Sequence, residues 1–258
     1  LDHDDYLRVV LETRPKAVSF HFGLPHPRQI QALKAAGIIT MVSATNLVEA
    51  RAIEAAGIDV IIAQGIEAGG HRGMFNPQLD SAITTKDLVQ LITAHCRLPV
   101  VAAGGIMHGS HAAKMLNLGA SAVQMGTAFI QCKSSNASAS YREALFKQPI
   151  TQITHSISGR PARGLINAWH SQVDQAERPP VPPYPYAYDL AKQLVENNGT
   201  LVMDTSPYCG DEGHKIGSFV YHFADCLLHD HVPGRTITMR ILGIDPGYGI
   251  TGFGLIEG

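Results

Sequence analysis

Three polar residues follow a short apolar run in the segment IIAQGIEAGGHRG, which extends from Ile61 to Gly73. They are Gln64, Glu67 and His71, and glycines stand among them. An imidazole ionises near neutral pH, so His71 could act as a general base or carry a positive charge. Glycines let the backbone come close to a bound molecule. We therefore predict a ligand-binding loop with His71 as its reactive group; the alternative is an ordinary surface-loop histidine.

Two further glycine turns follow apolar runs. Gly104-Gly105 comes after Val100–Ala103, and Gly126-Thr127 comes after Ala122–Met125. A helix is predicted to open soon after each turn, and backbone N–H groups at such a point favour an anion. Two neighbouring turns of this kind suit one phosphate group. The alternative is a pair of ordinary strand-to-helix turns, where glycine is common.

A repeating unit of strand, turn and helix would position these turns. Each predicted helix ends at a glycine or just before a proline, and the strands are apolar on both faces, as in a helix-covered parallel sheet. The predicted strands are Ala17–Phe22, Ile38–Val42, Ile58–Ala63, Val100–Ala103 and Ala122–Met125, and the predicted helices are Arg28–Ala36, Leu47–Ala56, Lys86–Cys96, Ser110–Leu118 and Ser138–Lys147. The stretch SGRPARGL, residues 158–165, is predicted to be a basic loop rich in turns.

The predicted fold class is α/β, with a closed (β/α)8 barrel and an open doubly wound sheet as the two candidates. In a barrel the functional loops follow the strands, and phosphate is often bound after strands 7 and 8. If the five predicted strands are strands 4 to 8 of a barrel, the glycine turns after Val100–Ala103 and Ala122–Met125 follow strands 7 and 8. We therefore expect residues 1–197 to form an incomplete parallel TIM-type barrel without its first three strands, followed by an irregular C-terminal tail.

Composition narrows the possible partners. The chain has 258 residues, 45% of them hydrophobic and 16% charged, and a net charge of −2. This balance indicates no nucleic-acid surface. No apolar run approaches the ~20 residues of a membrane span, and no signal peptide is visible. Four cysteines without framework spacing are typical of a reduced, cytoplasmic protein. The chain begins at Leu1 and its first methionine is Met41, so we expect that Leu1 is not a natural N-terminus.

The chain resembles the nitronate monooxygenase family, formerly called 2-nitropropane dioxygenases, in the segments AVSFHFG, AQGIEAGGHRG, VVAAGGI, LGASAVQMGTAFI and SGRPARGL. The resemblance implies an FMN-dependent TIM barrel that oxidises an alkyl nitronate or nitroalkane with O2 to a carbonyl compound and nitrite. It implies that His71 is the catalytic residue. It also implies FMN contacts, which fall on Gln64, Gly69, Gly105, Gln124, Met125, Gly126 and Thr127.

Two other functions stay open. The same FMN scaffold is found in NAD(P)H-linked enoyl-acyl-carrier-protein reductases, although the histidine loop and SGRPARGL resemble the nitronate branch more. A barrel without its first strands could also be an inactive remnant with exposed apolar surface. The sequence does not indicate the preferred nitronate or the oligomeric state.

The last part of the chain has a different character. Residues 198–238 are expected to form an irregular linker of non-native origin, in which scattered Cys and His match no standard zinc-finger spacing. We therefore predict no metal site. Residues 239–258, MRILGIDPGYGITGFGLIEG, resemble the N-terminus of the RuvC family of Holliday-junction resolvases, in which the residue matching Asp245 binds a metal. The rest of that domain is absent, so we expect Asp245 to be inert and two genes to be joined here.

Overall fold

The computed structural model describes residues 3–132, 135, 137–147, 150–166, 170, 179–184, 186–187, 240–245 and 252–257. Five adjacent parallel strands form the centre of the molecule, and helices lie between them in the sequence. The strands are β1 (Ala17–Phe20), β2 (Ile39–Ala44), β3 (Val60–Gln64), β5 (Val100–Ala103) and β6 (Ala122–Met125). This curled α/β sheet confirms the predicted fold class, since it corresponds to part of a (β/α)8 barrel.

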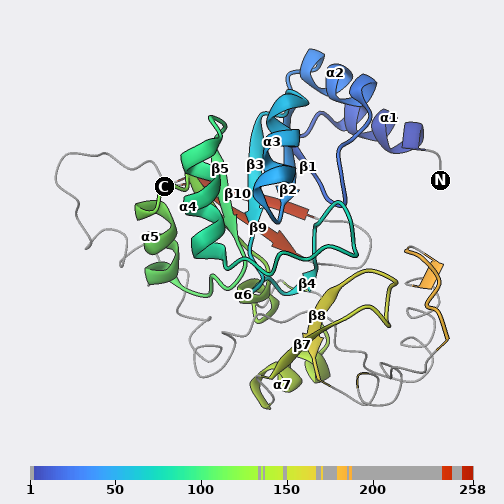
Figure 1. Ribbon diagram of the computed structural model, residues 1–258, viewed down its shortest axis with the longest axis vertical. Coiled ribbons are helices and arrows are strands. Elements are labelled where there is room, and N and C mark those ends of the chain that lie inside the picture. The colour runs from blue at the N-terminus through green and yellow to red at the C-terminus, as the bar shows by residue number, and fades with distance from the viewer. Residues whose placement is uncertain are drawn as a thin grey trace.

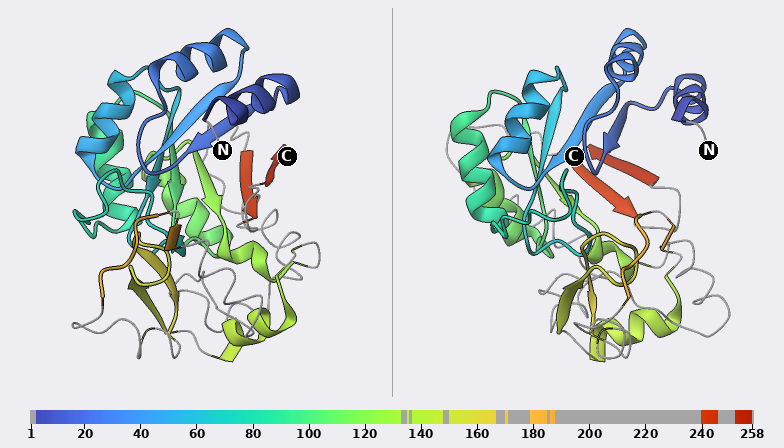
Figure 2. Two further views of the ribbon diagram at one scale, coloured as in Figure 1. Left: turned by 90° about the vertical axis from the view of Figure 1, so that its right-hand side faces the viewer. Right: turned by 45° about the vertical axis from the view of Figure 1, so that its right-hand side comes forward.

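The two faces of the sheet have different roles. On the outer face, residues such as Ile61, Ala63 and Val123 pack with the helices in one large apolar core. Figures 1 and 2 show these helices along one side of the sheet. They are α2 (Pro27–Ala35), α3 (Leu47–Ala55), α4 (Thr85–His95) and α5 (Gly109–Asn117). On the inner face a smaller cluster centres on Ile62 and Val101. Side chains alternate along each strand, so residues next to an outer-face residue face inward.

Local signals explain where the helices begin and end. The side chains of Asn46 and Thr84 accept hydrogen bonds from backbone N–H groups in the first turns of α3 and α4. This satisfies N–H groups that a helix start leaves unpaired. Gly37, Gly57 and Gly119 follow three of the helices with positive φ, where glycine is favoured. Each of these four predicted helices matches an observed one to within two residues at either end.

Other elements differ from the predictions. A helix that the sequence reading did not assign, α1 (His3–Thr13), precedes the sheet. The first strand ends at Phe20 rather than at Phe22, because Phe22 has a φ of +69° and cannot continue a strand. The predicted helix at Ser138–Lys147 is present as α7 (Ala139–Lys147), and a single-turn helix, α6 (Thr127–Ile130), follows β6 directly.

A second, three-stranded sheet lies below the first in Figure 1. It joins β4 (Gly70–His71), β8 (Ala162–Leu165) and β7 (Thr151–Thr154) in antiparallel pairs. The prediction that SGRPARGL is entirely a loop was therefore wrong, because its second half is strand β8. Pairing with the distant β4 stabilises it, and no pattern within the eight residues could signal that partner.

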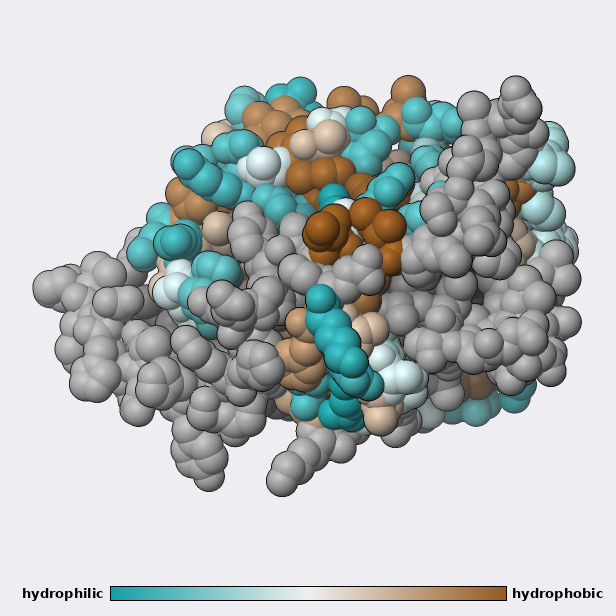
Figure 3. All heavy atoms as spheres, turned by 90° about the horizontal axis from the view of Figure 1, so that it is seen from below, coloured by the Kyte–Doolittle hydropathy of each residue, from teal (hydrophilic) through white to brown (hydrophobic). Residues whose placement is uncertain are grey.

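The C-terminal segment contributes two strands to the main sheet. Strand β9 (Arg240–Asp245) pairs in parallel with β6, and β10 (Gly252–Glu257) pairs antiparallel with β9. This part of the expected irregular tail is therefore regular. Residues 198–238, with their scattered Cys and His, lie outside the described residues. In the part of the chain that is described, no helix is long and apolar enough to cross a membrane. Figure 3 shows apolar residues gathered in a patch on the face seen from below.

Candidate active site at the ends of the strands

The loop between β3 and α4 is held together by the side-chain amide of Gln64. Its Oε1 accepts hydrogen bonds from the Gly73 backbone N–H at 2.7 Å and from Arg72 Nη1 at 3.3 Å. Its Nε2 donates to the carbonyl of His71 at 3.0 Å. The sequence resemblance placed Gln64 against a flavin, whereas the structure first gives it a role within the loop. One hydrogen of Nε2 has no partner among the described residues.

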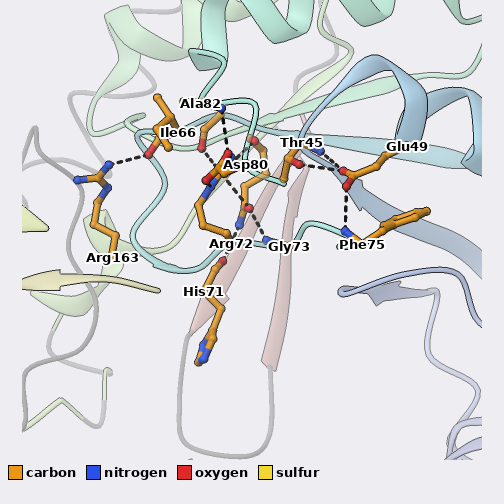
Figure 4. Close-up of polar contacts among 12 residues, drawn as sticks. Thr45, Glu49, Ile66, His71, Arg72, Gly73, Phe75, Asp80, Ala82 and Arg163 are labelled. Carbon is orange, nitrogen blue, oxygen red and sulfur yellow. Dashed lines mark hydrogen bonds and ion pairs between the residues drawn. The ribbon is translucent and has the colours of Figure 1, made fainter. Parts of the chain in front are cut away.

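A buried arginine closes the same loop from the other side (Figure 4). Arg72 is fully buried, and its guanidinium forms a two-bond ion pair with Asp80 at 3.0 and 3.1 Å. It also donates to the carbonyl of Gly65 at 2.6 Å. Burial alone would raise the pKa of Asp80, but its hydrogen bonds to Arg72 and to the Ala82 backbone, together with the positive charges of Arg72 and Arg163, outweigh burial and hold the pKa below its usual range. Figure 4 shows the His71 ring pointing away from this network.

His71 lies in a compact polar and aromatic environment. Its Nε2 is 2.8 Å from the hydroxyl of the buried Ser158. Its ring meets the rings of Phe22 and Tyr184 nearly edge-on, with centroids 5.8 and 5.6 Å away. Burial first, then the positive charges of Arg160 and His21, lower the pKa of His71 to about 4. His71 is therefore neutral at pH 7.

The residues around His71 come from four separate parts of the sequence. The positive φ of Phe22 turns the chain after β1, and its backbone N–H donates to the carbonyl of Gly73 at 3.2 Å. Ser158 precedes β8, and its hydroxyl donates to the carbonyl of Arg160 at 3.1 Å. His21 also lies near this site, and its Nδ1 is 2.8 Å from the hydroxyl of Ser43. Burial lowers the pKa of His21, so this second histidine is also held toward its neutral form.

Arg160 is the cation of this environment. Its guanidinium carbon lies 4.3 Å from the centroid of the Phe22 ring, and Nη2 donates to the carbonyl of Met74 at 2.6 Å. Its Nε is buried and has no hydrogen-bond partner among the residues that the structure describes. Among the described residues no carboxylate lies within ion-pair distance of it. The sequence reading missed Arg160, Ser158 and Phe22 as site residues, although all three fall in segments that carried the resemblance.

A row of side chains crosses the inner face at the ends of three neighbouring strands. In the strand register Gln64 pairs with Ala103, and Ala103 pairs with Gln124. The small Ala103 thus stands between two glutamines. Gln124 Oε1 is buried and accepts no hydrogen bond in the described structure. A buried acceptor without a partner is costly, so this row is suited to a ligand that offers an N–H donor.

The glycine turns follow the same strand ends. Gly104 and Gly105 have φ values of +107° and +67°. A side chain at Gly104 would place its Cβ 2.9 Å from the Ala68 backbone nitrogen, so the turns after β3 and β5 touch here. Gly126 and Thr127 follow β6, the strand that pairs with β5, so the two glycine turns follow neighbouring strands; anion binding by them stays a prediction. Met125 is buried in the outer core and can offer a ligand only its backbone.

Glu67 completes the loop. Its carboxylate accepts hydrogen bonds from the backbone N–H and the hydroxyl of Thr85, the first residue of α4, at 2.8 and 2.9 Å. The Thr85 hydroxyl also lies 2.9 Å from the carbonyl oxygen of Gly104, so its one hydrogen is shared between this acceptor and Glu67. Glu67 thus links the histidine loop to the turn after β5. Gly69, predicted to contact the cofactor, lies in the bend just before β4.

Comparison with known proteins identifies the family of the chain. The profile of the nitronate monooxygenase family matches residues 2–206. This chain belongs to the nitronate monooxygenase family. It is 53% identical over 198 residues to a nitronate monooxygenase of Pseudomonas aeruginosa, covering 75% of this chain and 56% of that protein. It is 49% identical over 191 residues to one from Paraburkholderia phytofirmans, covering 73% and 52%. The chain therefore spans about half the length of these curated relatives.

Two solved structures extend the likeness to the fold. The nitroalkane oxidase of Streptomyces ansochromogenes matches with a TM-score of 0.75 and 32% identity, over 87% of this chain and 70% of that one. FabK of Thermotoga maritima matches with a TM-score of 0.66 and 28% identity, over 87% and 73%. The nitronate monooxygenase family is in general flavin-dependent. The predicted family is thus confirmed, while the particular flavin and the contacts remain predictions.

Proposed function

We propose that this chain carries the flavin site and the catalytic base of an FMN-dependent nitronate monooxygenase. The observation that carries the proposal is His71, a neutral histidine held by Ser158 at the ends of the sheet strands. A neutral imidazole can accept a proton from the carbon next to a nitro group. The relatives named for nitronate oxidation and the nitroalkane oxidase structure support the same chemistry.

The residues at the strand ends fit a flavin. Gln124 Oε1 offers a buried acceptor, and Gln64 Nε2 offers a donor hydrogen on the same face of the sheet. Ala103 between them leaves room for a flat ring. Gly105 and the Gly126–Thr127 turn would hold the phosphate through backbone N–H groups. Bound FMN would supply electron acceptance from the nitronate and reaction with O2, which protein side chains do not supply.

The protein's own contribution is proton handling and orientation. The Ser158 hydroxyl has one hydrogen, and we propose that it donates this hydrogen to the carbonyl of Arg160 and accepts the hydrogen of His71 Nε2. This arrangement fixes the ring tautomer and keeps a basic lone pair on the imidazole. The low pKa argues against one role that the sequence left open, a protonated His71 that stabilises the nitronate at neutral pH. The positive charge at this site comes from Arg160.

The test is reconstitution followed by turnover. The full chain is incubated with FMN, excess FMN is removed, and the retained flavin absorbance is recorded. Nitrite formation from an alkyl nitronate and from the parent nitroalkane is then measured. We expect His71→Ala to retain FMN and to lose about 100-fold or more of its turnover of the neutral nitroalkane. A colourless protein, or equal turnover by the variant, would refute the proposal.

Anaerobic NADPH separates this function from the reductase alternative. A monooxygenase of the proposed type leaves the flavin oxidised when NADPH is added without O2. A reductase on the same scaffold bleaches it. Rapid bleaching without nitronate turnover would therefore replace the proposed function with the reductase function.

A further inference from the structure

Arg160 forms no ion pair with a described residue, although Glu49 and Tyr184 act on its charge. Arg72 forms a two-bond ion pair with Asp80. Arg163 lies where Glu67 and Asp80 both act on its charge. Arg160 is half-buried, and the described residues include no ion-pair partner for it. Removing a cation from water is costly unless an anion or hydrogen-bond acceptors compensate, so this position favours an anionic ligand.

The donor atoms of Arg160 are only partly used. Nη2 donates to the carbonyls of Met74 and Phe75 at 2.6 and 3.3 Å. Nε is buried and has no partner among the described residues. The hydrogen bonds that the guanidinium makes to these residues both come from Nη2, and none comes from Nη1. A guanidinium suits planar groups with two oxygen atoms, because its N–H groups lie in one plane. The N–H groups on two nitrogen atoms of Arg160, Nε and Nη1, thus remain for a ligand.

Phe22 and Ser158 fix Arg160 close to His71. The guanidinium stacks on the Phe22 ring, and the same ring meets His71 edge-on. Ser158 hydrogen-bonds to the backbone of Arg160 and to the ring of His71. A molecule that touches His71 therefore lies within the field of the Arg160 charge.

We infer that Arg160 is the anion-binding residue of this site and that it recognises the paired oxygen atoms of a nitronate through Nε and Nη1. The inference rests on the proposed function and names which protonation state of the substrate the site selects. A nitronate carries its negative charge on these oxygens, whereas a neutral nitroalkane does not. Charge selection then belongs to Arg160, and proton removal from a neutral nitroalkane belongs to His71.

Inorganic nitrate is the probe, because it is a planar anion with the same N–O geometry and is not turned over. We would titrate sodium nitrate into the FMN-loaded full chain by calorimetry, and repeat the titration without added FMN. Loss of a charge-assisted hydrogen bond predicts that Arg160→Gln weakens nitrate binding by about 10-fold or more. Arg160→Lys, which keeps the charge but loses the planar donors, should fall between the wild type and the glutamine variant.

Arg163→Gln is the matched control. Arg163 lies in the same segment, is also half-buried and also has a buried Nε without a partner. Its guanidinium donates instead to Ile66 and Thr151. We expect this variant to keep nitrate affinity within about twofold.

If Arg160→Gln does not fold, Phe22→Leu provides a second test, since it removes the ring that positions the guanidinium and should weaken nitrate binding by about 3-fold or more.

The pH dependence identifies the cation. Arginine stays charged, so nitrate affinity should be flat between pH 5.5 and 8.5. Affinity that disappears above about pH 6.5 would assign the charge to a histidine and overturn the inference. So would an absence of nitrate binding, or unchanged affinity in Arg160→Gln. A different outcome is that nitrate binding depends on Arg160 but the chain does not turn over nitronate. This outcome would refute the proposed function and leave an oxyanion site.

Discussion

At the scale of single residues, the site depends on keeping a histidine neutral. His71 is surrounded by Phe22, Tyr184 and the Ser158 hydroxyl, and a cation lies nearby. Each of these favours the uncharged ring or fixes its orientation. A neutral ring can accept a proton, so the same features that depress its basicity keep it available as a base at neutral pH. The cost of this arrangement is that acid weakens the folded state.

This cost can be measured without any turnover. In the unfolded chain His71 binds its proton near its ordinary pKa of 6.5, whereas in the fold it does so only near 4. The unfolded state therefore binds more protons between these values, and the free energy of unfolding should fall as pH falls through this window. The loss due to His71 should amount to roughly 2–3 kcal/mol.

His71→Gln isolates that contribution. We expect the variant to lose less stability than the wild type between pH 7 and pH 4.5, as measured by urea unfolding at each pH. The pKa of His21 is shifted in the same direction, but His21 is present in both proteins, so its contribution from burial cancels and only its electrostatic coupling to His71 differs. Equal pH slopes for the two proteins would show that His71 is not held neutral by the fold.

The sequence predicted some of these residues and not others. His71 was recognisable because it follows a glycine pair in a loop after a strand. Ser158 and Arg160 were not, because they meet His71 only through pairing of β4 with β8, 87 residues apart for the Ser158 contact. Gln64 was predicted to contact a cofactor, but its loop-holding amide bonds depend on how the chain returns at Gly73. Such contacts have no local pattern.

At the scale of elements, the histidine is positioned by the long loop between β3 and α4. This loop has one two-residue strand, so side chains rather than a ladder of backbone bonds determine its shape. Arg72 joins its two halves through Asp80 and the carbonyl of Gly65. Glu67 ties it to the start of α4, and Gly104 lets the turn after β5 pack directly against it.

The Arg72–Asp80 ion pair should contribute strongly to stability. Asp80→Asn leaves a fully buried guanidinium without its counter-charge, so we expect the free energy of unfolding to fall by about 3 kcal/mol. Urea unfolding at pH 7 is the measurement. Glu143→Gln is the control, because Glu143 pairs with Lys147 on the exposed surface of α7. An exposed pair of this kind should give no measurable change. Similar losses in both variants would contradict the assigned role.

Gly104 should tolerate no side chain. Gly104→Ala combines a φ of +107° with a Cβ 2.9 Å from the Ala68 nitrogen and 3.0 Å from the Thr85 hydroxyl. We expect a loss of about 3 kcal/mol in thermal or urea unfolding, and weaker FMN retention if the adjoining turn holds the phosphate. Gly37→Ala shares the positive φ but meets no atom within 4 Å, so it should lose only about 1 kcal/mol. Equal losses of stability in the two variants would mean that the positive φ alone, and not the close contact with Ala68, sets the cost of a side chain at Gly104.

At the scale of the whole molecule, the five parallel strands form part of a barrel and leave two edges. The strand pattern predicted this, because each βα unit carries its own apolar run and a glycine or proline at the end of its helix. Strand β1 ends the sheet on one side. On the other side β9 continues the ladder from β6, with Val123 opposite Ile241 and Met125 opposite Gly243. No sequence rule could predict that pairing, since it joins segments more than 100 residues apart.

The pairing of β9 with β6 predicts a specific effect of shortening the chain. Removing residues 240–258 leaves the backbone groups of β6 that face β9 without partners, at an edge with apolar neighbours. Net hydrogen-bond energies of about 1 kcal/mol each predict a loss of about 2 kcal/mol in the free energy of unfolding. Amide hydrogen exchange should quicken in β6 and stay unchanged in β2 and β3, which keep both neighbours. An unchanged exchange rate in β6 would show that β9 does not stabilise this edge, and that the five parallel strands hold the strand-end site without it.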